Sequence, residues 1–298
     1  MKNESLLFAI TSSTKLAKKI SEESGIPLGD VELNYFADGE FMARVLSNVK
    51  DKVTYIVQST CKPSPEKIFE ILVLSDALKQ CGAKEIILII PYFGFARQDR
   101  VAREGEPITA KLVANMFEVP GISKVISVDL HTFQIQGFFS CPVENLQPTL
   151  LFADYYRSYF EKEGISYSDL AVVSPDHGSA LRARDLCSEF EGAELVFIDK
   201  RRPAPNKSEV TNVVGNIKDK YCLIVDDIID TGGTIDNAVE ALLNKGAKGI
   251  YVCATHGVFS KGKIDPRIKK IVVTDTIENS FEGATVLSVA KLIADTIK

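Results

Sequence analysis

The sequence lacks three features, and each absence argues against a class of protein. It has no Cys-x-x-Cys pair among six scattered cysteines, which favours reduced thiols over a zinc site or a disulfide framework. Its net charge is −5, so no general basic field attracts nucleic acid. Its longest apolar run, Ile86 to Phe93, is far below the ~20 residues that a membrane span needs. The early run from Leu6 to Ile10 is too short for a signal peptide. We expect a cytoplasmic protein without nucleic-acid or membrane partners.

Short apolar runs alternate with helix-length amphipathic stretches throughout the sequence. This alternation predicts an α/β fold with mainly parallel sheets. Each expected helix is followed by Gly, which is a typical helix-terminating signal. The expected strands are 6–10, 53–58, 85–90, 124–129, 170–174, 195–199, 223–227, 249–255 and 270–274, and the clearest expected helices are 14–24, 66–81 and 233–245.

The length of 298 residues predicts two domains. A Gly-Ala-Lys triplet precedes an expected strand at Gly82 and again at Gly246, and the surrounding helix–turn–strand order repeats with it. Prolines interrupt the pattern near Pro148. We therefore expect domains at 1–147 and 148–285, with a last helix at 286–298 packing on the first domain.

A strand followed by a glycine-rich turn is the strongest local feature. The strand ends in two carboxylates, Asp226 and Asp227, which can accept hydrogen bonds from sugar hydroxyls. Glycines let the backbone approach a ligand closely, and the free N–H groups at a helix start favour a phosphate. The turn consists of Asp230, Thr231, Gly232, Gly233 and Thr234. An ordinary strand–turn–helix is the alternative, but the paired acids, glycines and threonines favour a phosphoribose site.

One segment of the first half combines an aromatic ring with two carboxylates. Phe36, Asp38 and Glu40 are expected on one side of an extended segment, where they are suited to stacking on a purine and hydrogen-bonding it. A strand end with a turn at Asp38 and Gly39 explains the same residues equally well.

A second segment of the first half is basic. Arg97 and Arg100 follow the expected strand at 85–90, where ligand sites of α/β proteins lie. Guanidinium groups suit a triphosphate because they pair with phosphates in bidentate geometry. A solvated loop would also be basic, so these charges alone do not distinguish a triphosphate site from a solvent-exposed loop.

Two residues after further strands are candidate ligands for Mg²⁺. His131 follows the strand at 124–129, although a core or capping role is the commoner fate of a single His. Imidazole is also an unusual ligand for a hard cation. Asp176 follows the strand at 170–174 and is chemically the better magnesium ligand.

Together these motifs resemble the ribose-phosphate pyrophosphokinase family, in order and over nearly the whole chain. The segment at 226–234 alone resembles the loop of type I phosphoribosyltransferases that binds phosphoribosyl pyrophosphate (PRPP). The resemblance implies two similar phosphoribosyltransferase-like domains, each a mainly parallel sheet flanked by helices. It also implies transfer of pyrophosphate from Mg–ATP to C1 of ribose 5-phosphate, giving PRPP and AMP. The matching motifs are FADGE at 36–40, PYFGFARQDR at 91–100, DLHTFQIQGFF at 129–139, SPDHGS at 174–179, DKRRP at 199–203 and VDDIIDTGGT at 225–234.

The same resemblance implies residue roles. Lys200 and Arg202, in a basic loop that would otherwise be read as solvated, would be catalytic. Mg²⁺ would be held by His131 and Asp176. The residues implied for ATP are Phe36, Asp38, Gly39, Glu40, Arg97, Gln98, Arg100 and His131, and those implied for ribose 5-phosphate are Arg202, Asp226, Asp227, Asp230, Thr231, Gly232, Gly233 and Thr234.

The family shares its ATP sites between adjacent subunits, with the segment at 36–40 reaching across. Self-association as at least a dimer is therefore expected, and a hexamer by analogy. Two rival interpretations are a PRPP-using salvage transferase and a non-catalytic regulatory homologue. The first leaves the motifs at 36–40 and 91–100 unexplained. The second should have lost residues such as Lys200, which is present.

The sequence also departs from the family's pattern. Val101 and Gly105 stand where regulated members carry further charge, and those members continue beyond the position of Lys298 with a tail. We therefore expect weak or absent allosteric control by ADP and phosphate. His177 and Ser179 replace usually small residues, and for His177 a solvent-facing position is favoured over a phosphate contact.

Overall fold

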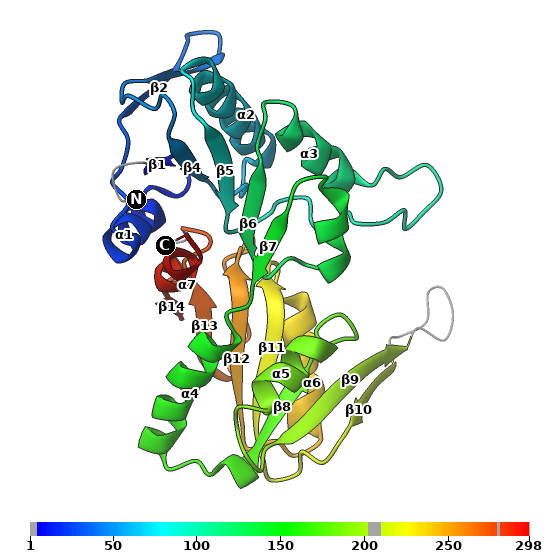
Figure 1. Cartoon of the computed structure of the whole chain (residues 1–298). Helices are drawn as coiled ribbons and strands as arrows, with labels where there is room; N and C mark the ends of the chain where they lie inside the picture. The colour runs from blue at the N-terminus through cyan, green and yellow to red at the C-terminus, as the bar shows by residue number, and fades with distance from the viewer. Residues whose placement is uncertain (1–4, 202–209, 279–280, 298) are drawn as a thin grey trace. The chain divides into compact units, whose positions relative to one another are not determined.

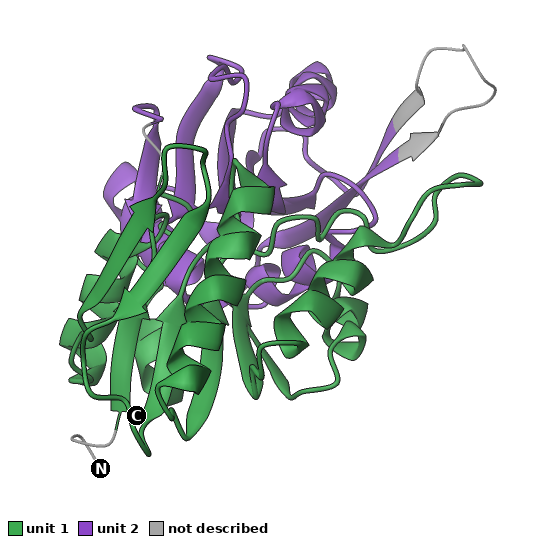
Figure 2. Ribbon diagram, turned by 90° about the horizontal axis from the view of Figure 1, so that it is seen from above, with its two compact units in different colours: residues 1–146, 275–278, 288–298 green, residues 147–274, 279–287 purple. Residues whose placement is uncertain are grey.

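The computed structural model describes residues 5–201, 210–278 and 281–297, which form two compact units. Unit 1 comprises residues 1–146, 275–278 and 288–298, and unit 2 comprises residues 147–274 and 279–287. Figure 1 labels the elements, and Figure 2 colours the two units. The division therefore falls one residue before the expected boundary at 147/148, and the expected second domain at 148–285 is interrupted, because residues 275–278 belong to unit 1. None of the helices in the described ranges is both long and apolar enough to span a membrane.

Unit 1 contains a five-stranded parallel sheet in the order β1-β4-β5-β6-β7. The strands are β1 (Ser5–Ala9), β4 (Val53–Val57), β5 (Glu85–Ile90), β6 (Lys124–Val128) and β7 (Val143–Leu146). A separate antiparallel hairpin pairs β2 (Val31–Tyr35) with β3 (Phe41–Val45). The helices are α1 (Thr14–Ser24), α2 (Ser64–Gln80), α3 (Thr109–Glu118), the short 3-10 helix η1 (Phe133–Phe138) and α7 (Ala290–Ile297).

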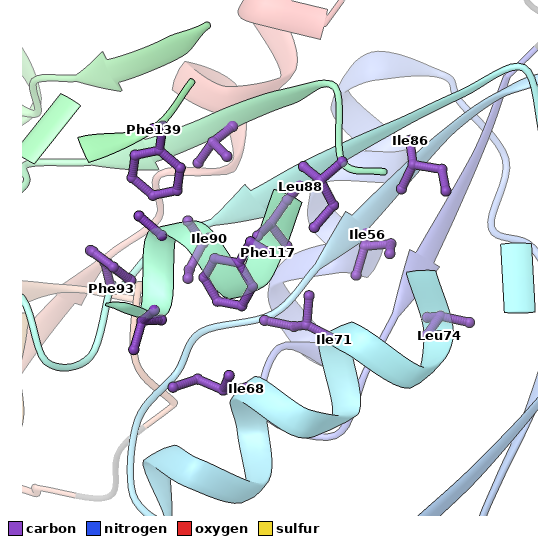
Figure 3. Packing of buried hydrophobic residues seen from close by; sticks show 14 of the residues in the cluster. Ile56, Ile68, Ile71, Leu74, Ile86, Leu88, Ile90, Phe93, Phe117 and Phe139 are labelled. Carbon is purple, nitrogen blue, oxygen red and sulfur yellow. The ribbon is translucent and has the colours of Figure 1, made fainter. Parts of the chain in front are cut away.

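The core of unit 1 forms where α2 and α3 pack on one face of this sheet (Figure 3). Ile71 and Leu74 of α2 and Phe117 of α3 are fully buried against Ile56 and Leu88 of the sheet. Helix α7 packs against α1 within the same unit, although it lies at the other end of the sequence. Parallel strands covered by helices are buried on both faces, which explains their nearly continuous apolar sequences.

Unit 2 contains a seven-stranded sheet in the order β10-β9-β8-β11-β12-β13-β14. All neighbours are parallel except β9 and β10. The strands are β8 (Leu170–Ser174), β9 (Glu194–Arg201), β10 (Val210–Val214), β11 (Tyr221–Ile229), β12 (Gly249–Gly257), β13 (Ile268–Thr274) and β14 (Ala284–Leu287), and the helices are α4 (Thr149–Glu163), η2 (Tyr167–Asp169), α5 (Ala180–Cys187) and α6 (Gly233–Asn244).

Successive residues of the unit 2 strands point to opposite faces of the sheet, so the unit has two cores. Cys222 and Ile224 of β11 pack with α6 on one face. Leu223 and Val225 pack with α4 and α5 on the other face. Tyr156 of α4 is completely buried there, and its hydroxyl donates to the carbonyl oxygen of Val252 at 2.8 Å.

Every strand expected from the sequence is present, and the helices expected at 14–24, 66–81 and 233–245 are present with ends shifted by at most a few residues. The last helix, expected at 286–298, begins only at Ala290, because residues 284–287 form strand β14. The strands that the sequence analysis missed are β2, β3, β7, β10 and β14. The extended segment expected at 36–40 was wrong. Phe36, Asp38 and Glu40 lie in the turn of the β2–β3 hairpin, where the N–H of Phe36 donates to the carbonyl of Glu40 and that of Gly39 donates to the carbonyl of Phe36.

Candidate functional site

The order of strands in unit 2 creates a natural ligand-binding edge. The chain leaves β8 for β9 on one side and returns to β11 on the other side. Ligands of open α/β sheets bind beyond the carboxyl ends of strands at such a reversal. Asp176 follows β8, and Asp226 and Asp227 lie near the end of β11. The topology therefore brings the three predicted carboxylates to one edge.

Hydrogen bonds fix the loop after β8. The Ser174 hydroxyl donates to the carbonyl oxygen of Asp176 at 2.6 Å. One carboxylate oxygen of Asp176, Oδ1, accepts from the N–H groups of Gly178 at 2.9 Å and Ser179 at 3.3 Å. The loop thereby orients the Asp176 carboxylate with its own backbone.

Ser179 links this loop to β11. Its hydroxyl donates to Asp226 Oδ1 at 2.6 Å, and the same oxygen accepts from the N–H of Asp227 at 2.9 Å. Both Ser179 and Asp226 are buried. This contact was not predictable, because nothing in the sequence pairs Ser179 with Asp226, and Ser179 stood out only as a departure from the family's pattern.

The Asp226 carboxyl is strongly perturbed. Burial, and then the charge of Asp227, raise its pKa well above the ordinary value of an aspartate. The charge of Asp176 acts in the same direction, whereas the Ser179 hydrogen bond opposes it. Carboxylates that destabilise one another's charge favour a cation or a sugar hydroxyl beside them.

The glycine-rich turn lies beside these acids in the chain and opens α6. Gly232 takes the left-handed conformation with φ 86°, and a Cβ there would meet the carbonyl oxygen of Lys263 at 3.2 Å. Thr231 and Gly233 are exposed, Thr234 and Asp230 are half-buried, and Ile235 anchors the helix in the core. Among the described residues no side chain caps α6, so its first N–H groups are suited to an anion.

The predicted catalytic residues fall at the edge of what the structure describes. Lys200 belongs to β9, where it pairs with Thr211 of β10, but its side chain lies outside the described part of the chain. Arg202 lies outside the described residues altogether. His177 is 86% exposed, and its Nε2 lies 3.3 Å from Asp199 Oδ1, next to Lys200 in the sequence.

In unit 1, the loop after β5 is anchored by two buried hydroxyl residues that follow β4. The N–H of Thr60 donates to the carbonyl of Tyr92 at 2.9 Å, and the N–H of Tyr92 donates to the Ser59 hydroxyl at 3.2 Å. The N–H of Gly94 donates to the Thr60 hydroxyl at 2.6 Å. Phe95 follows in the left-handed conformation with φ 66°, a strained state that the surrounding hydrogen bonds hold in place.

These anchors place the predicted ATP residues of the loop. Gln98 Oε1 accepts from the Thr109 hydroxyl at 2.6 Å, next to the start of α3. Asp99 Oδ2 accepts from the Thr132 hydroxyl at 2.9 Å, which joins the loop to the neighbour of His131. Arg97, Gln98 and Arg100 are exposed and His131 is half-buried. The structure therefore brings the loop and the His131 segment together within unit 1.

The tip of the β2–β3 hairpin is exposed from Phe36 to Glu40. The N–H of Glu40 donates to Asp38 Oδ1 at 3.1 Å, which stabilises the turn. A hollow of about 510 Å³ separates the tip from helix α2; its lining includes Gly39, Glu40, Pro65 and Phe69. The two predicted metal ligands, His131 and Asp176, belong to different units.

Within the described ranges, no three His, Cys, Asp or Glu side chains converge closely enough to hold a metal ion by themselves. Mg²⁺ usually keeps several waters and is bound through one or two carboxylates and substrate phosphates. The carboxylates of Asp176 and Asp226 fit that kind of site, because both supply oxygen ligands and like charge surrounds Asp226.

Comparison with known proteins decides the family. A family model described as the N-terminal domain of ribose phosphate pyrophosphokinase matches residues 5–121, and the phosphoribosyl transferase domain model matches residues 145–290. A ribose-phosphate pyrophosphokinase of Halalkalibacterium halodurans is 45% identical over 98% of this chain and 92% of its own length. Ribose-phosphate pyrophosphokinase 1 of Streptococcus agalactiae is 44% identical, with the same coverage.

The chain belongs to the ribose-phosphate pyrophosphokinase family. The crystal structure of phosphoribosylpyrophosphate synthetase from Mycobacterium smegmatis matches with a TM-score of 0.89 and 36% identity, over 99% of this chain and 97% of that one. The family, the fold of two phosphoribosyltransferase-like domains and the enzyme class expected from the sequence are thereby confirmed. The residue roles stay predictions.

Gly94→Ala tests the anchoring of the 91–100 loop. A Cβ at this position would lie 2.2 Å from the carbonyl oxygen of Thr60, so the loop must shift or strain. We expect the free energy of unfolding, measured by urea denaturation, to fall by about 1–3 kcal/mol. Gly137→Ala is the control, since a Cβ there meets nothing within 4 Å. Equal stability of the two variants would contradict the anchor.

Asp226→Asn tests the electrostatic cost of the carboxylate cluster. Because the folded-state pKa of Asp226 is raised above its unfolded-state value, this carboxyl destabilises the ligand-free fold increasingly as the pH rises from the unfolded-state pKa towards the folded-state pKa, and by a constant amount above it. The neutral amide should therefore raise the Tm in EDTA at neutral pH. The gain in Tm should shrink as the pH falls, since the wild-type carboxyl then becomes protonated. A gain that is independent of pH would mean that charge is not the cause.

Proposed function

We propose that this chain makes PRPP by transferring the β,γ-pyrophosphoryl group of Mg–ATP to the C1 hydroxyl of ribose 5-phosphate. The ribose oxygen attacks the β-phosphorus and loses its proton. The bond from that phosphorus to the oxygen bridging it to the α-phosphorus breaks, and AMP leaves with the bridging oxygen. The observation that carries the proposal is full-length similarity to ribose-phosphate pyrophosphokinases, combined with acids and an uncapped helix start at one edge of unit 2.

Ribose 5-phosphate binds in unit 2 in this proposal. The N–H groups and hydroxyls of residues 230–234 receive its phosphate, because a helix start offers unpaired donors and a favourable dipole. Asp226 and Asp227 accept hydrogen bonds from its hydroxyls. The Ser179 hydrogen bond supports this role, since it fixes the orientation of the Asp226 carboxyl through Oδ1.

ATP binds to the residues of Phe36–Glu40, Arg97–Arg100 and His131. The guanidinium groups of Arg97 and Arg100 contact the triphosphate, and Phe36 stacks on the purine. Asp176 and His131 are the proposed ligands of Mg²⁺, and the carboxylate of Asp176 is chemically the better one. Mg²⁺ held by these residues would neutralise charge on the phosphates.

Lys200 and Arg202 act on the transferred group in this proposal. Phosphoryl-type transfer depends on positioning and on neutralising spread negative charge more than on covalent help. In this proposal Lys200 and Arg202 supply that positive charge.

The decisive experiment follows AMP and PRPP together in a mixture of protein, ATP, Mg²⁺ and ribose 5-phosphate. Equal formation of both products, strictly dependent on the sugar phosphate, is expected. ATP cleavage without PRPP, or no AMP despite saturable ATP binding, would contradict the proposed reaction.

Lys200→Ala should lower kcat in this assay by at least ~100-fold, as expected for loss of one preorganised electrostatic stabiliser. Lys207→Ala, in the same basic segment but without a proposed contact, is the matched control. Unchanged turnover of the Lys200 variant would remove Lys200 from the mechanism.

Self-association is part of the proposal, with the hairpin tip of one subunit completing the ATP site of a neighbour. Phe36, which is 55% exposed, supports an intermolecular role. Subunits carrying Asp38→Ala and subunits carrying Lys200→Ala should therefore complement each other when they are co-expressed, because some mixed sites receive an intact residue from both chains. Activity no higher than that of either variant alone would place residue 38 in its own subunit's site.

A further inference from the structure

The described part of unit 1 contains a buried ionic cluster outside the predicted contacts. Glu70 of α2 is 1% exposed and accepts four hydrogen bonds. Lys67, one turn earlier on α2, donates to Glu70 Oε1 at 2.8 Å and forms an ion pair with it. A buried carboxylate is tolerated when an opposite charge and hydrogen bonds compensate it, and here both do.

The other donors to Glu70 come from three separate segments. Thr11, which follows β1, and Gln58, which follows β4, each donate to Oε2 at 2.6 Å. The hydroxyl of Tyr35, the last residue of β2, donates to Oε1. The cluster thus ties the hairpin to the carboxyl ends of two sheet strands and to α2.

Tyr35 belongs to the exposed end of the hairpin and is 50% exposed, although its hydroxyl reaches the buried Glu70. The hairpin body packs on the core through Leu33 and Ala43, whereas the five residues after Tyr35 are exposed. The Tyr35 ring also contacts that of Phe41, with centroids 5.1 Å apart. The hollow beside α2 leaves the tip without close packing on that side. The hydrogen bond from the Tyr35 hydroxyl to Glu70 therefore connects the hairpin tip to helix α2.

We propose that Glu70 and Tyr35 are positioning residues that hold the hairpin tip, and with it Phe36, Asp38 and Glu40, in the orientation that binds ATP. The inference rests on the proposed ATP role of the tip. Neither residue touches the reacting atoms. Burial and the adjacent Glu70 carboxylate raise the pKa of Tyr35 to about 12, so the hydroxyl stays a donor throughout the neutral range.

Tyr35→Phe keeps the ring contact with Phe41 and removes only the donor. We expect the KM for ATP to rise about 5-fold, as for loss of one charge-assisted hydrogen bond that preorganises a binding segment, with kcat and the KM for ribose 5-phosphate little changed. Glu70→Gln should act in the same direction and more strongly, because the amide nitrogen cannot accept from the donors around it. Tyr156→Phe is the control, since it removes a hydrogen-bonded hydroxyl from the core of unit 2.

Asp38→Ala distinguishes a failure of the positioning role from a failure of the proposed ATP role of the tip. If Asp38→Ala raises the KM for ATP but Tyr35→Phe and Glu70→Gln do not, the positioning role is wrong and the proposed function stands. If Asp38→Ala also leaves that KM unchanged, the ATP role of the tip is wrong and the positioning role falls with it. Equal changes in kcat and both KM values for Tyr35→Phe, or a change shared by Tyr156→Phe, would show a general structural effect and overturn the proposal.

Discussion

Buried negative charge is the constraint on which both halves of this chain depend, and the two units meet it in opposite ways. In unit 1, Glu70 is enclosed by Lys67 and three neutral donors, so its charge is compensated within the fold. In unit 2, Asp226 has a serine hydroxyl and a backbone N–H beside it, but Asp227 and Asp176 add like charge. A buried carboxylate with compensating partners is compatible with a stable fold. A buried carboxylate surrounded by like charge lowers the stability of the ligand-free fold, and a bound cation or sugar can remove that destabilisation.

This contrast explains how an acidic protein can bind highly anionic substrates. With a net charge of −5, the chain has no general field that attracts phosphates. The proposed phosphate contacts therefore come from local donors in the described residues, namely the guanidinium groups after β5 and the backbone N–H groups at the start of α6. Helix starts and fixed loops supply such donors without long side chains that must be ordered on binding.

Much of the fold could be predicted from the sequence because the central strands are buried on both faces. Continuous apolar runs such as those of β5 and β8 can be recognised as buried strands from the sequence alone. Strands β2, β10 and β14 lie at edges or in the hairpin and mix polar with apolar residues, so no clear period distinguishes them. The turn at Asp38-Gly39 was recognised only as an alternative, since an aromatic and acidic pentapeptide is equally compatible with an extended segment.

The motifs gave the candidate site residue by residue, but the residues that hold them in place were not predictable. Ser179, Thr60 and Glu70 each act through a partner at least 30 positions away, and an isolated Ser, Thr or Glu carries no sequence signal of that partner. For Glu70 the distances are 35 residues to Tyr35 and 59 to Thr11. Side chains that contact a ligand form motifs because they adjoin one strand end, whereas their supports are set by which strand ends the topology makes neighbours. The supporting residues therefore depend on tertiary structure, and they are the part of the site that the structure adds to the sequence.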